Sequence, residues 1–235
     1  MAEKQVTVEA VETIEIVERA KGFWAKYSKP IIYAGSAIIL LTGAWLGYKN
    51  LVKIPNEEKA ADMIFPAEQL FDKMTQQGFN KDSVNLVLNG GNGIAAGVLK
   101  VASNYGGTTA GNRAHFIAGA CYLHNKDFNN AVKHLKDFST PATQIQSAAY
   151  NMLGDAYSEL KKNEEAFDYY KKAAAVNTKD EFMTAEALYK AGLFAEATGK
   201  TKEAIGFYQK IKDEYPKNSH AFEMDKYLAR LGVIK

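Results

Sequence analysis

The chain has 235 residues, a net charge of +2 and 47% hydrophobic residues, which is ordinary composition for a globular protein. This near balance of charge argues against a nucleic-acid partner, and a single cysteine excludes an internal disulfide. That cysteine, Cys121, lies in the apolar stretch AGACYL, which predicts a buried thiol and not a reactive one.

The arm at residues 1–29 precedes a long apolar segment. Over residues 5–20, apolar side chains alternate with glutamates, which fits either a short amphipathic helix or a frayed segment; the apolar positions are Val8, Val11, Ile14 and Val17. The arm is too long and too acidic for the basic start of a signal peptide, and it offers no well-placed small-x-small cleavage site. We therefore expect the apolar segment to stay attached as an anchor.

Residues Pro30–Tyr48 are 19 residues without a charge. A helix of that length covers roughly 28 Å, close to the hydrocarbon thickness of a bilayer. Lysines and aromatic residues flank both ends, as is typical of membrane spans: Phe23, Trp24, Lys26, Tyr27 and Lys29 before, Trp45, Tyr48, Lys49 and Lys53 after. The pattern favours one transmembrane helix over a buried core helix. Within it, the GxxxG pair of Gly43 and Gly47 predicts contact with a partner helix.

Charges near the span set its expected orientation. The N-terminal flank carries four basic residues and the C-terminal flank three, counted as Arg19, Lys21, Lys26 and Lys29 against Lys49, Lys53 and Lys59. This small excess favours a cytoplasmic N-terminus. In a bacterium the larger C-terminal part would then lie in the periplasm, on the outer side of the inner membrane.

Residues 49–110 are predicted to hold a linker helix and a degenerate first repeat. Asn56–Gln77 has a helical pattern, in which Pro66 indicates a kink or a restart. Ile94–Tyr105 is predicted as a second helix, ended by two glycines. The stretch between these helices, including Asn89–Gly93, is expected to be a loop, and its glycine spacing matches no phosphate-binding motif.

Three segments within residues 111–218 repeat one pattern; they are Asn112–Phe138, Ser147–Ala173 and Ala185–Ile211. Glycines, alanines and large residues align at offsets of 35 and 38 residues: Gly119, Gly154 and Gly192; Ala131, Ala166 and Ala204; Leu135, Tyr170 and Tyr208. Each segment is predicted to be a helix, a tight turn and an antiparallel helix. The small residues would let the paired helices approach closely, and the large residues would fill space toward the next unit.

The expected turns fall at His124–Asp127, Lys161–Asn163 and Gly199–Thr201, and Pro216 closes the third unit. Residues 219–235 are predicted to form a final helix, Ser219–Leu231, capped by Ser219 and ended by Gly232. Such a helix covers the apolar edge of the last repeat. The predicted fold is therefore all-α: one transmembrane helix, then a solenoid of helical repeats with a capping helix.

The repeated pattern resembles the tetratricopeptide repeat, a unit of 34 residues. With the arm and the span, the arrangement resembles the YfgM-like ancillary subunit of the SecYEG translocon, most of all the type found in Bacteroidota. The stretch from Leu86 to Leu123, LVLNGGNGIAAGVLKVASNYGGTTAGNRAHFIAGACYL, and the Tyr215–Pro216 repeat end carry this likeness. The resemblance implies a periplasmic domain that associates with the translocon and with periplasmic chaperones or nascent secreted proteins.

No pattern in the sequence predicts catalysis, a cofactor or a metal site. The histidines His115, His124, His134 and His220 are scattered, and no two have the i, i+4 spacing of metal ligands on one helix. We therefore expect a binding protein, not an enzyme, without a small-molecule substrate.

The first helix of each repeat is expected to line a concave binding surface. The predicted inward-facing residues are Arg113, Phe116 and Leu123, then Asn151, Asp155 and Ser158, then Glu186, Tyr189, Leu193 and Glu196. The combination of lysines, an arginine and asparagines that grips a C-terminal carboxylate in chaperone-tail clamps is missing, and Asp155 and Glu186 would repel such a ligand. The leading hypothesis is an anchored interaction module at the Sec translocon; the alternative is a structural scaffold of another envelope or secretion complex.

Overall fold

The structure is a computed structural model that describes the backbone of residues 2–176 and 178–233, and the side chains of these residues from Ile16 onward. The described residues form helices and turns, with one isolated bridge between Gly91 and Ile94 in place of any strand. The chain divides into two compact units, Met1–Pro55 and Asn56–Lys235. The predicted all-helical fold is confirmed.

The N-terminal unit is built on α1, a helix of 47 residues from Ala2 to Tyr48. It continues through Pro30 and is followed by a π-helical turn, η1 (Lys49–Lys53). The arm is therefore helical from residue 2. Of its apolar positions, the side chains of Val8, Val11 and Ile14 lie outside the described residues, and Val17 is 49% exposed.

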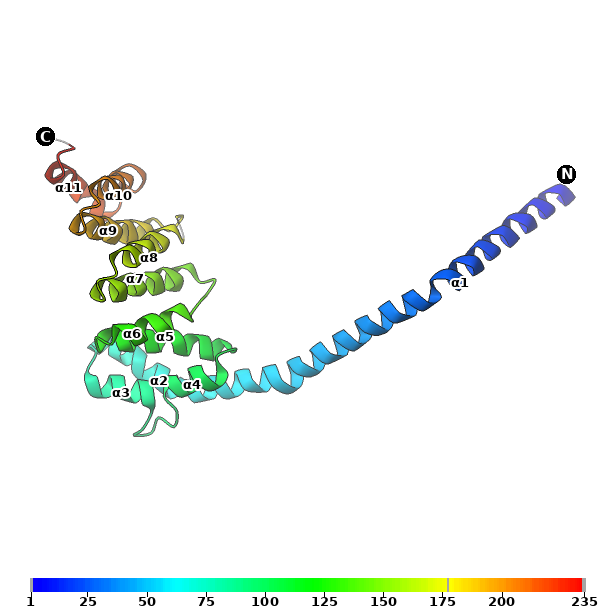
Figure 1. Cartoon of the computed structure of the whole chain (residues 1–235), viewed down its shortest axis with the longest axis horizontal. Coiled ribbons are helices and arrows are strands. Elements are labelled where there is room, and N and C mark those ends of the chain that lie inside the picture. The colour runs from blue at the N-terminus through cyan, green and yellow to red at the C-terminus, as the bar shows by residue number, and fades with distance from the viewer. Residues whose placement is uncertain (1, 177, 234–235) are drawn as a thin grey trace. The chain divides into compact units, whose positions relative to one another are not determined.

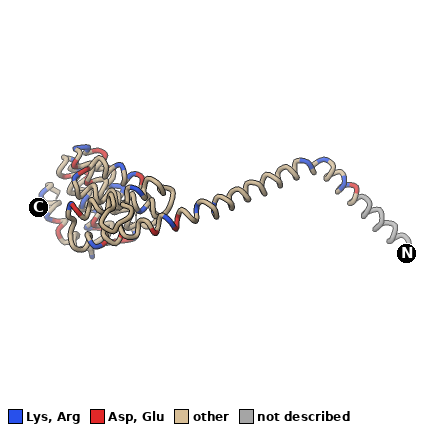
Figure 2. Tube along the Cα trace, turned by 90° about the horizontal axis from the view of Figure 1, so that it is seen from below, with Lys and Arg blue, Asp and Glu red and all other residues tan. Residues whose placement is uncertain are grey.

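The apolar segment of α1 is exposed. Ile39, Leu40 and Leu41 are 71–73% accessible, and Figure 2 shows this stretch free of charge with basic residues at both ends. Helix α1 is long and apolar enough to cross a membrane. The exposure of its apolar side chains within the N-terminal unit argues against the core-helix alternative.

The C-terminal unit is an array of short helices packed side by side (Figure 1). Its elements are α2 (Ile54–Gln77), α3 (Lys81–Asn89), α4 (Val98–Tyr105), α5 (Thr109–His124), α6 (Phe128–Lys136), α7 (Thr143–Glu159), α8 (Asn163–Ala175), α9 (Glu181–Ala197), α10 (Thr201–Glu214), η2 (Ser219–Glu223) and α11 (Met224–Arg230). The pairs α5–α6, α7–α8 and α9–α10 are the three predicted helical hairpins.

The region before the first hairpin differs from the prediction in two elements. Helix α2 runs through Pro66 without a restart. An additional helix, α3, lies where a loop was expected, because the Asn80 side chain accepts a hydrogen bond from the Ser83 amide at 2.8 Å and so caps the helix start. Three buried residues on one face of α3, Val84, Val87 and Leu88, hold it on the core.

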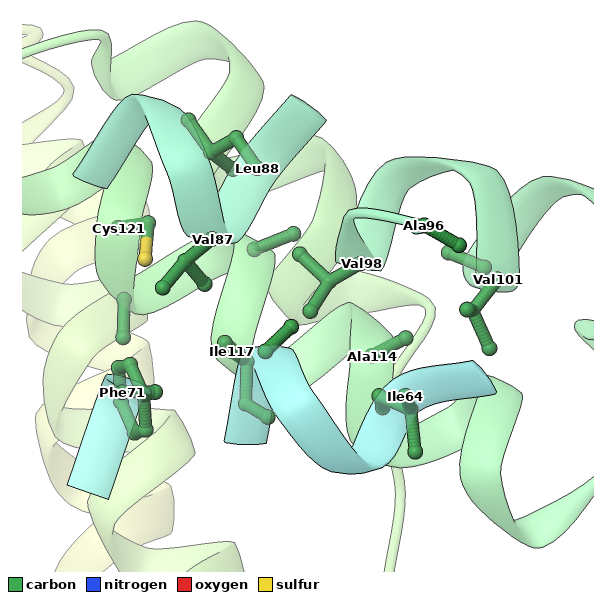
Figure 3. Close-up of a cluster of buried hydrophobic side chains, with 14 of the residues drawn as sticks. Ile64, Phe71, Val87, Leu88, Ala96, Val98, Val101, Ala114, Ile117 and Cys121 are labelled. Carbon is green, nitrogen blue, oxygen red and sulfur yellow. The ribbon is translucent and has the colours of Figure 1, made fainter. Parts of the chain in front are cut away.

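Helix α4 begins at Val98, four residues later than predicted. Gly90, Gly91 and Gly93 adopt positive φ in the preceding loop, a conformation that interrupts helical structure. The core of this region joins α2, α3, α4 and α5 (Figure 3). Cys121 is fully buried in it, as predicted.

Each hairpin is held by a contact between the glycine of its first helix and a large residue of its second. A Cβ on Gly119, Gly154 or Gly192 would lie 2.4, 2.6 or 2.5 Å from Leu135, Tyr170 or Tyr208, respectively. The large residues therefore pack within their own unit as well as toward the next one, where the sequence pattern predicted only the second contact. Tyr170 also reaches the next unit, with its ring 5.1 Å from that of Phe194.

The turns of the three hairpins are also equivalent. Lys126, Lys161 and Gly199 adopt left-handed backbone conformations with φ of 61°, 59° and 76°, and they are separated by the same offsets of 35 and 38 residues. Ala131, Ala166 and Ala204 are fully buried. The three hairpins therefore share one geometry, and their turns lie at the predicted positions.

The C-terminal segment covers the last hairpin in two short pieces instead of one helix. It begins with η2, a 3-10 turn, and continues as α11, so the predicted single helix Ser219–Leu231 is wrong in detail. The cap is also one residue earlier: Asn218, not Ser219, accepts a hydrogen bond from the His220 amide. Met224 and Leu228 are buried on the third hairpin, and Gly232 follows with a positive φ.

Candidate protein-binding surface

The predicted inward-facing residues lie on α5, α7 and α9, the first helices of the three hairpins. Helix α5 contacts α7, and α7 contacts α9. These helices therefore form one continuous row, although the surroundings of the predicted residues differ from one end of the row to the other.

In the third unit, the predicted residues on α9 are contacted by the C-terminal segment. His220 Nε2 lies 2.6 Å from a Glu186 carboxylate oxygen, and the His220 ring stacks on Tyr189 with centroids 4.1 Å apart. The hydroxyls of Tyr189 and Tyr227 share a hydrogen bond. The hydrogen bond with Tyr227, together with burial, raises the pKa of Tyr189 to about 12.

Glu196, at the end of the same helix, is held by two donors. The Tyr208 hydroxyl donates to it at 2.9 Å and Arg230 at 2.7 Å. Burial opposes its charged form, but these hydrogen bonds outweigh burial and lower the pKa of the Glu196 carboxyl. Leu193 remains 37% exposed. Of the four predicted residues in this unit, three are therefore engaged by their own chain.

In the second unit, Asp155 accepts a hydrogen bond from the Tyr170 hydroxyl at 2.7 Å and lies 3.7 Å from Lys190 Nζ on α9. Burial, reinforced by the charge of Asp155, raises the pKa of Tyr170. Asn151 Oδ1 is buried and has no hydrogen-bond partner among the described residues. Such an acceptor costs roughly 1–3 kcal/mol, so an N–H donor at this position would be favourable.

In the first unit, Arg113 pairs with Glu68 of α2, with Arg113 Nε 2.7 Å from Glu68 Oε1. Phe116 packs on Phe138, with ring centroids 5.0 Å apart, while Leu123 is half-buried. A second carboxylate also joins these helices, because Glu57 accepts a hydrogen bond from the Thr109 amide at 2.9 Å. Helix α2 is thus fixed against the start of α5 at two points.

A groove of about 600 Å³ lies between α2, α5, the α6–α7 loop and α7. We call it the α2–α5–α7 groove. It is lined by Glu68, Phe71 and Asp72 of α2, Thr109, Asn112, Arg113, Phe116 and Ile117 of α5, Phe138 and Thr140 of the loop, and Gln144, Ile145 and Ala148 of α7. It contains two of the predicted residues, Arg113 and Phe116, and its size is that of a ligand pocket.

The second and third hairpins also match a known sequence family. Residues 147–180 and 186–218 each match a family described as tetratricopeptide repeat. The chain is a tetratricopeptide-repeat protein. No curated protein matches its sequence. Tetratricopeptide-repeat proteins are generally interaction modules and not enzymes, which agrees with a surface made of helix faces.

The first hairpin also brings together two histidines that lie far apart in the sequence. His115 of α5 and His134 of α6 place their Nδ1 atoms 3.2 Å apart. Burial lowers the pKa of both, His115 further lowers the pKa of His134, and the carboxylate of Asp137 partly opposes both shifts. Helical spacing could not reveal this pair, because the two residues lie on opposite helices of one hairpin.

The remaining reactive side chains are the buried thiol of Cys121 and residues that do not group as metal ligands. Burial raises the pKa of the Cys121 thiol to about 12, which removes it as a nucleophile at neutral pH. Within the part of the chain whose side chains are described, no three residues among His, Cys, Asp and Glu are arranged to hold a metal ion.

A second hollow of about 620 Å³ lies between α3 and the α5–α6 turn, where Phe79 stacks on His124.

Proposed function

We propose that this tetratricopeptide-repeat protein is a membrane-anchored protein-interaction module. The proposal rests on one combination: matched repeats in the same chain as a helix whose apolar residues are exposed. A repeat array offers a surface for a protein partner, and an exposed apolar helix of this length fits the hydrocarbon interior of a bilayer.

In the proposed topology, Pro30–Tyr48 crosses the bacterial inner membrane once. The arm before it lies in the cytoplasm, and the repeats lie in the periplasm. The support for this orientation is the excess of basic residues before the span over those after it. A reporter fused after Lys235 tests it: alkaline phosphatase would be active in the periplasm, whereas activity of a cytoplasmic reporter at this position would reverse the topology.

The proposed partner of the span is another membrane helix. Gly43 and Gly47 are one turn apart on α1, and a Cβ at either would meet no atom within 4 Å. Both are therefore free to let a neighbouring helix approach closely. Replacing both with leucine would weaken a specific helix contact while keeping the hydrophobicity of the span.

We infer the partner machinery from the resemblance described above: the Sec translocon, with a periplasmic chaperone or a nascent secreted protein on the repeat surface. In this proposal the contact residues are those exposed along α5, α7 and α9, with the α2–α5–α7 groove at one end. The alternative function is a structural scaffold of another envelope or secretion complex.

Purification in a mild detergent followed by mass spectrometry distinguishes the two functions. The first predicts that translocon subunits co-purify with the full chain and are depleted when Gly43 and Gly47 are both leucine. Substitution of Gly22, which lies on α1 outside the span, is the matched control. Enrichment of cell-wall or outer-membrane machinery without translocon subunits would favour the scaffold.

A further inference from the structure

We propose that the α2–α5–α7 groove binds an apolar segment of a partner protein that carries a neighbouring lysine or arginine. This inference rests on the proposed interaction function and specifies the chemistry of the partner. Three properties of the groove support it: an apolar floor, polar lining groups that are already paired, and an excess of negative charge.

The floor of the groove is apolar. Phe71, Ile117 and Phe138 are at least 91% buried beneath it, and the half-buried ring of Phe116 packs on Phe138. At the α7 side, Ile145 is 46% exposed although it borders this apolar surface. An apolar side chain placed here would remove Ile145 and Phe116 from water, at roughly 25 cal/mol per Å² of apolar surface buried.

Three of the polar side chains around this floor, Asn112, Gln144 and Arg113, already have partners within the protein. Asn112 exchanges two hydrogen bonds with the backbone of Ser139, at 2.8 and 3.1 Å. Gln144 donates to Asp180 at 3.1 Å, and Arg113 is held by Glu68. A polar occupant would have to break these contacts, whereas an apolar one leaves them intact. The groove therefore selects apolar groups.

The charges at the rim favour a cation beside the apolar group. Glu68 and Asp72 lie one turn apart on α2 and face the same groove. Arg113 neutralises Glu68, whereas the Asp72 carboxylate is exposed and has no ion-pair partner within residues 16–176 and 178–233. The lining thus has a net charge of −1, from two carboxylates and one guanidinium. A basic partner residue would be attracted and an acidic one repelled.

The occupant is a protein segment and not an enclosed small molecule. The groove opens to solvent at both Asp72 and Ile145, which are exposed residues on opposite walls. A segment of a second chain can therefore enter from the surface with its backbone outside the groove. The walls are also helix faces of a repeat array, on which partners bind as helices or extended segments.

Fluorescence anisotropy with the full chain in zwitterionic nanodiscs tests this inference. Three labelled peptides of equal length serve as probes: one of leucine, phenylalanine and lysine, one with the lysines replaced by glutamate, and one with the apolar residues replaced by serine. We expect the apolar basic peptide to bind about tenfold more tightly than either of the others. Equal binding of the serine peptide would overturn the apolar part, and equal binding of the glutamate peptide would overturn the basic part.

Variants then locate the site. Ile145→Asp is expected to lower the affinity for the apolar basic peptide about tenfold. Phe182→Asp, at a 64% exposed residue of α9 outside the groove, should leave this affinity unchanged. Asp72→Lys is expected to abolish the preference for lysine over glutamate, and Asp62→Lys, at an exposed position of the same helix, serves as its control. Equal losses in a variant and its control would place the binding elsewhere and refute the inference.

Failure of this inference differs from failure of the proposed function. If none of the three peptides binds, the inference is wrong, and co-purification of translocon subunits would still support the interaction module. If the peptides bind as expected but no envelope protein co-purifies, the groove chemistry stands and the proposed translocon function fails.

Discussion

The first and third units of the array have the same hairpin but different surroundings. In the third unit, the C-terminal segment contacts Glu186, Tyr189 and Glu196 of α9. In the first unit, α2 adds an acidic wall beside α5 and leaves the α2–α5–α7 groove open. The comparison teaches that the repeat itself sets only the helix positions. The segments before and after the array determine which part of the surface remains free.

The largest expected effect comes from breaking the cover of the third unit. Leu228 is 2% exposed and packs on the third hairpin. Leu228→Ala should lower the free energy of unfolding by about 2–5 kcal/mol, because it leaves a cavity. Urea unfolding followed by circular dichroism in a non-ionic detergent measures this, since both tryptophans, Trp24 and Trp45, lie outside the repeats.

The matched control is Phe222→Ala, at a residue of η2 that is 80% exposed. Its expected effect is within about 0.5 kcal/mol. A similar loss for both variants would mean that the segment is held by something other than its buried face, and the contrast between the two units would weaken.

The contact shared by both units is expected to have the next largest effect. In Gly119→Ala the new Cβ would lie 2.4 Å from Leu135 Cγ, and in Gly192→Ala 2.5 Å from the Tyr208 ring. Each should cost about 1–3 kcal/mol through overpacking. Gly206→Ala on α10 is the control, because no atom lies within 4 Å of its Cβ position. Higher helix propensity should make it neutral or stabilising by up to about 1 kcal/mol, and equal behaviour at all three glycines would disprove the proposed contact.

Low pH should destabilise the first unit through protonation of His115 and His134. Their pKa values lie below the usual 6.5 in the folded protein, so below pH 6.5 the unfolded chain binds more protons than the folded one. Stability should therefore fall as the pH decreases from 6.5 toward the lowered pKa values. Urea midpoints measured across this range test it.

The double substitution of His115 and His134 by glutamine should reduce this dependence, because neither position then takes up a proton, and leave the part due to His124, whose pKa burial also lowers. An unchanged slope in the double variant would assign the acid sensitivity to other groups. In that case the histidine pair would not distinguish the first unit from the third.

The smallest expected effect is at the ion pair beside the open groove. Arg113 and Glu68 are partly exposed, so Arg113→Gln should cost less than about 1 kcal/mol. It should also leave Glu68 without its cation. The affinity for the apolar basic peptide should then rise about twofold to threefold. Weaker binding in this variant would show that Arg113, and not the carboxylates, contacts the partner.

Much of the fold was predictable because the signals were local or periodic. The length of the uncharged stretch Pro30–Tyr48 was sufficient to predict a span, and the aligned glycines and alanines were sufficient to predict the hairpins. Helix α3 could also have been found, since Asn80 precedes apolar residues with helical spacing. It was hidden by the glycine- and asparagine-rich composition of the region that follows it.

The candidate site was less predictable because it depends on contacts between distant residues. Arg113 and Phe116 were expected on the inner surface, but the groove also needs Glu68 and Asp72, which approach α5 only after folding. The position of the C-terminal segment was foreseen as a cover of the last repeat. Its polar contacts with Glu186 and Glu196 join residues 34 positions apart in the chain, which the helical pattern does not specify.

The enclosed thiol of Cys121 has a practical consequence. Because burial keeps it protonated and out of reach of water-soluble reagents, the chain behaves toward maleimides as if it had no cysteine. Single cysteines placed at exposed positions such as Asp72 or Phe182 would then react alone, without removal of the native residue. Spin labels or dyes at such positions would measure the distance between the repeats and the lipid in the intact protein.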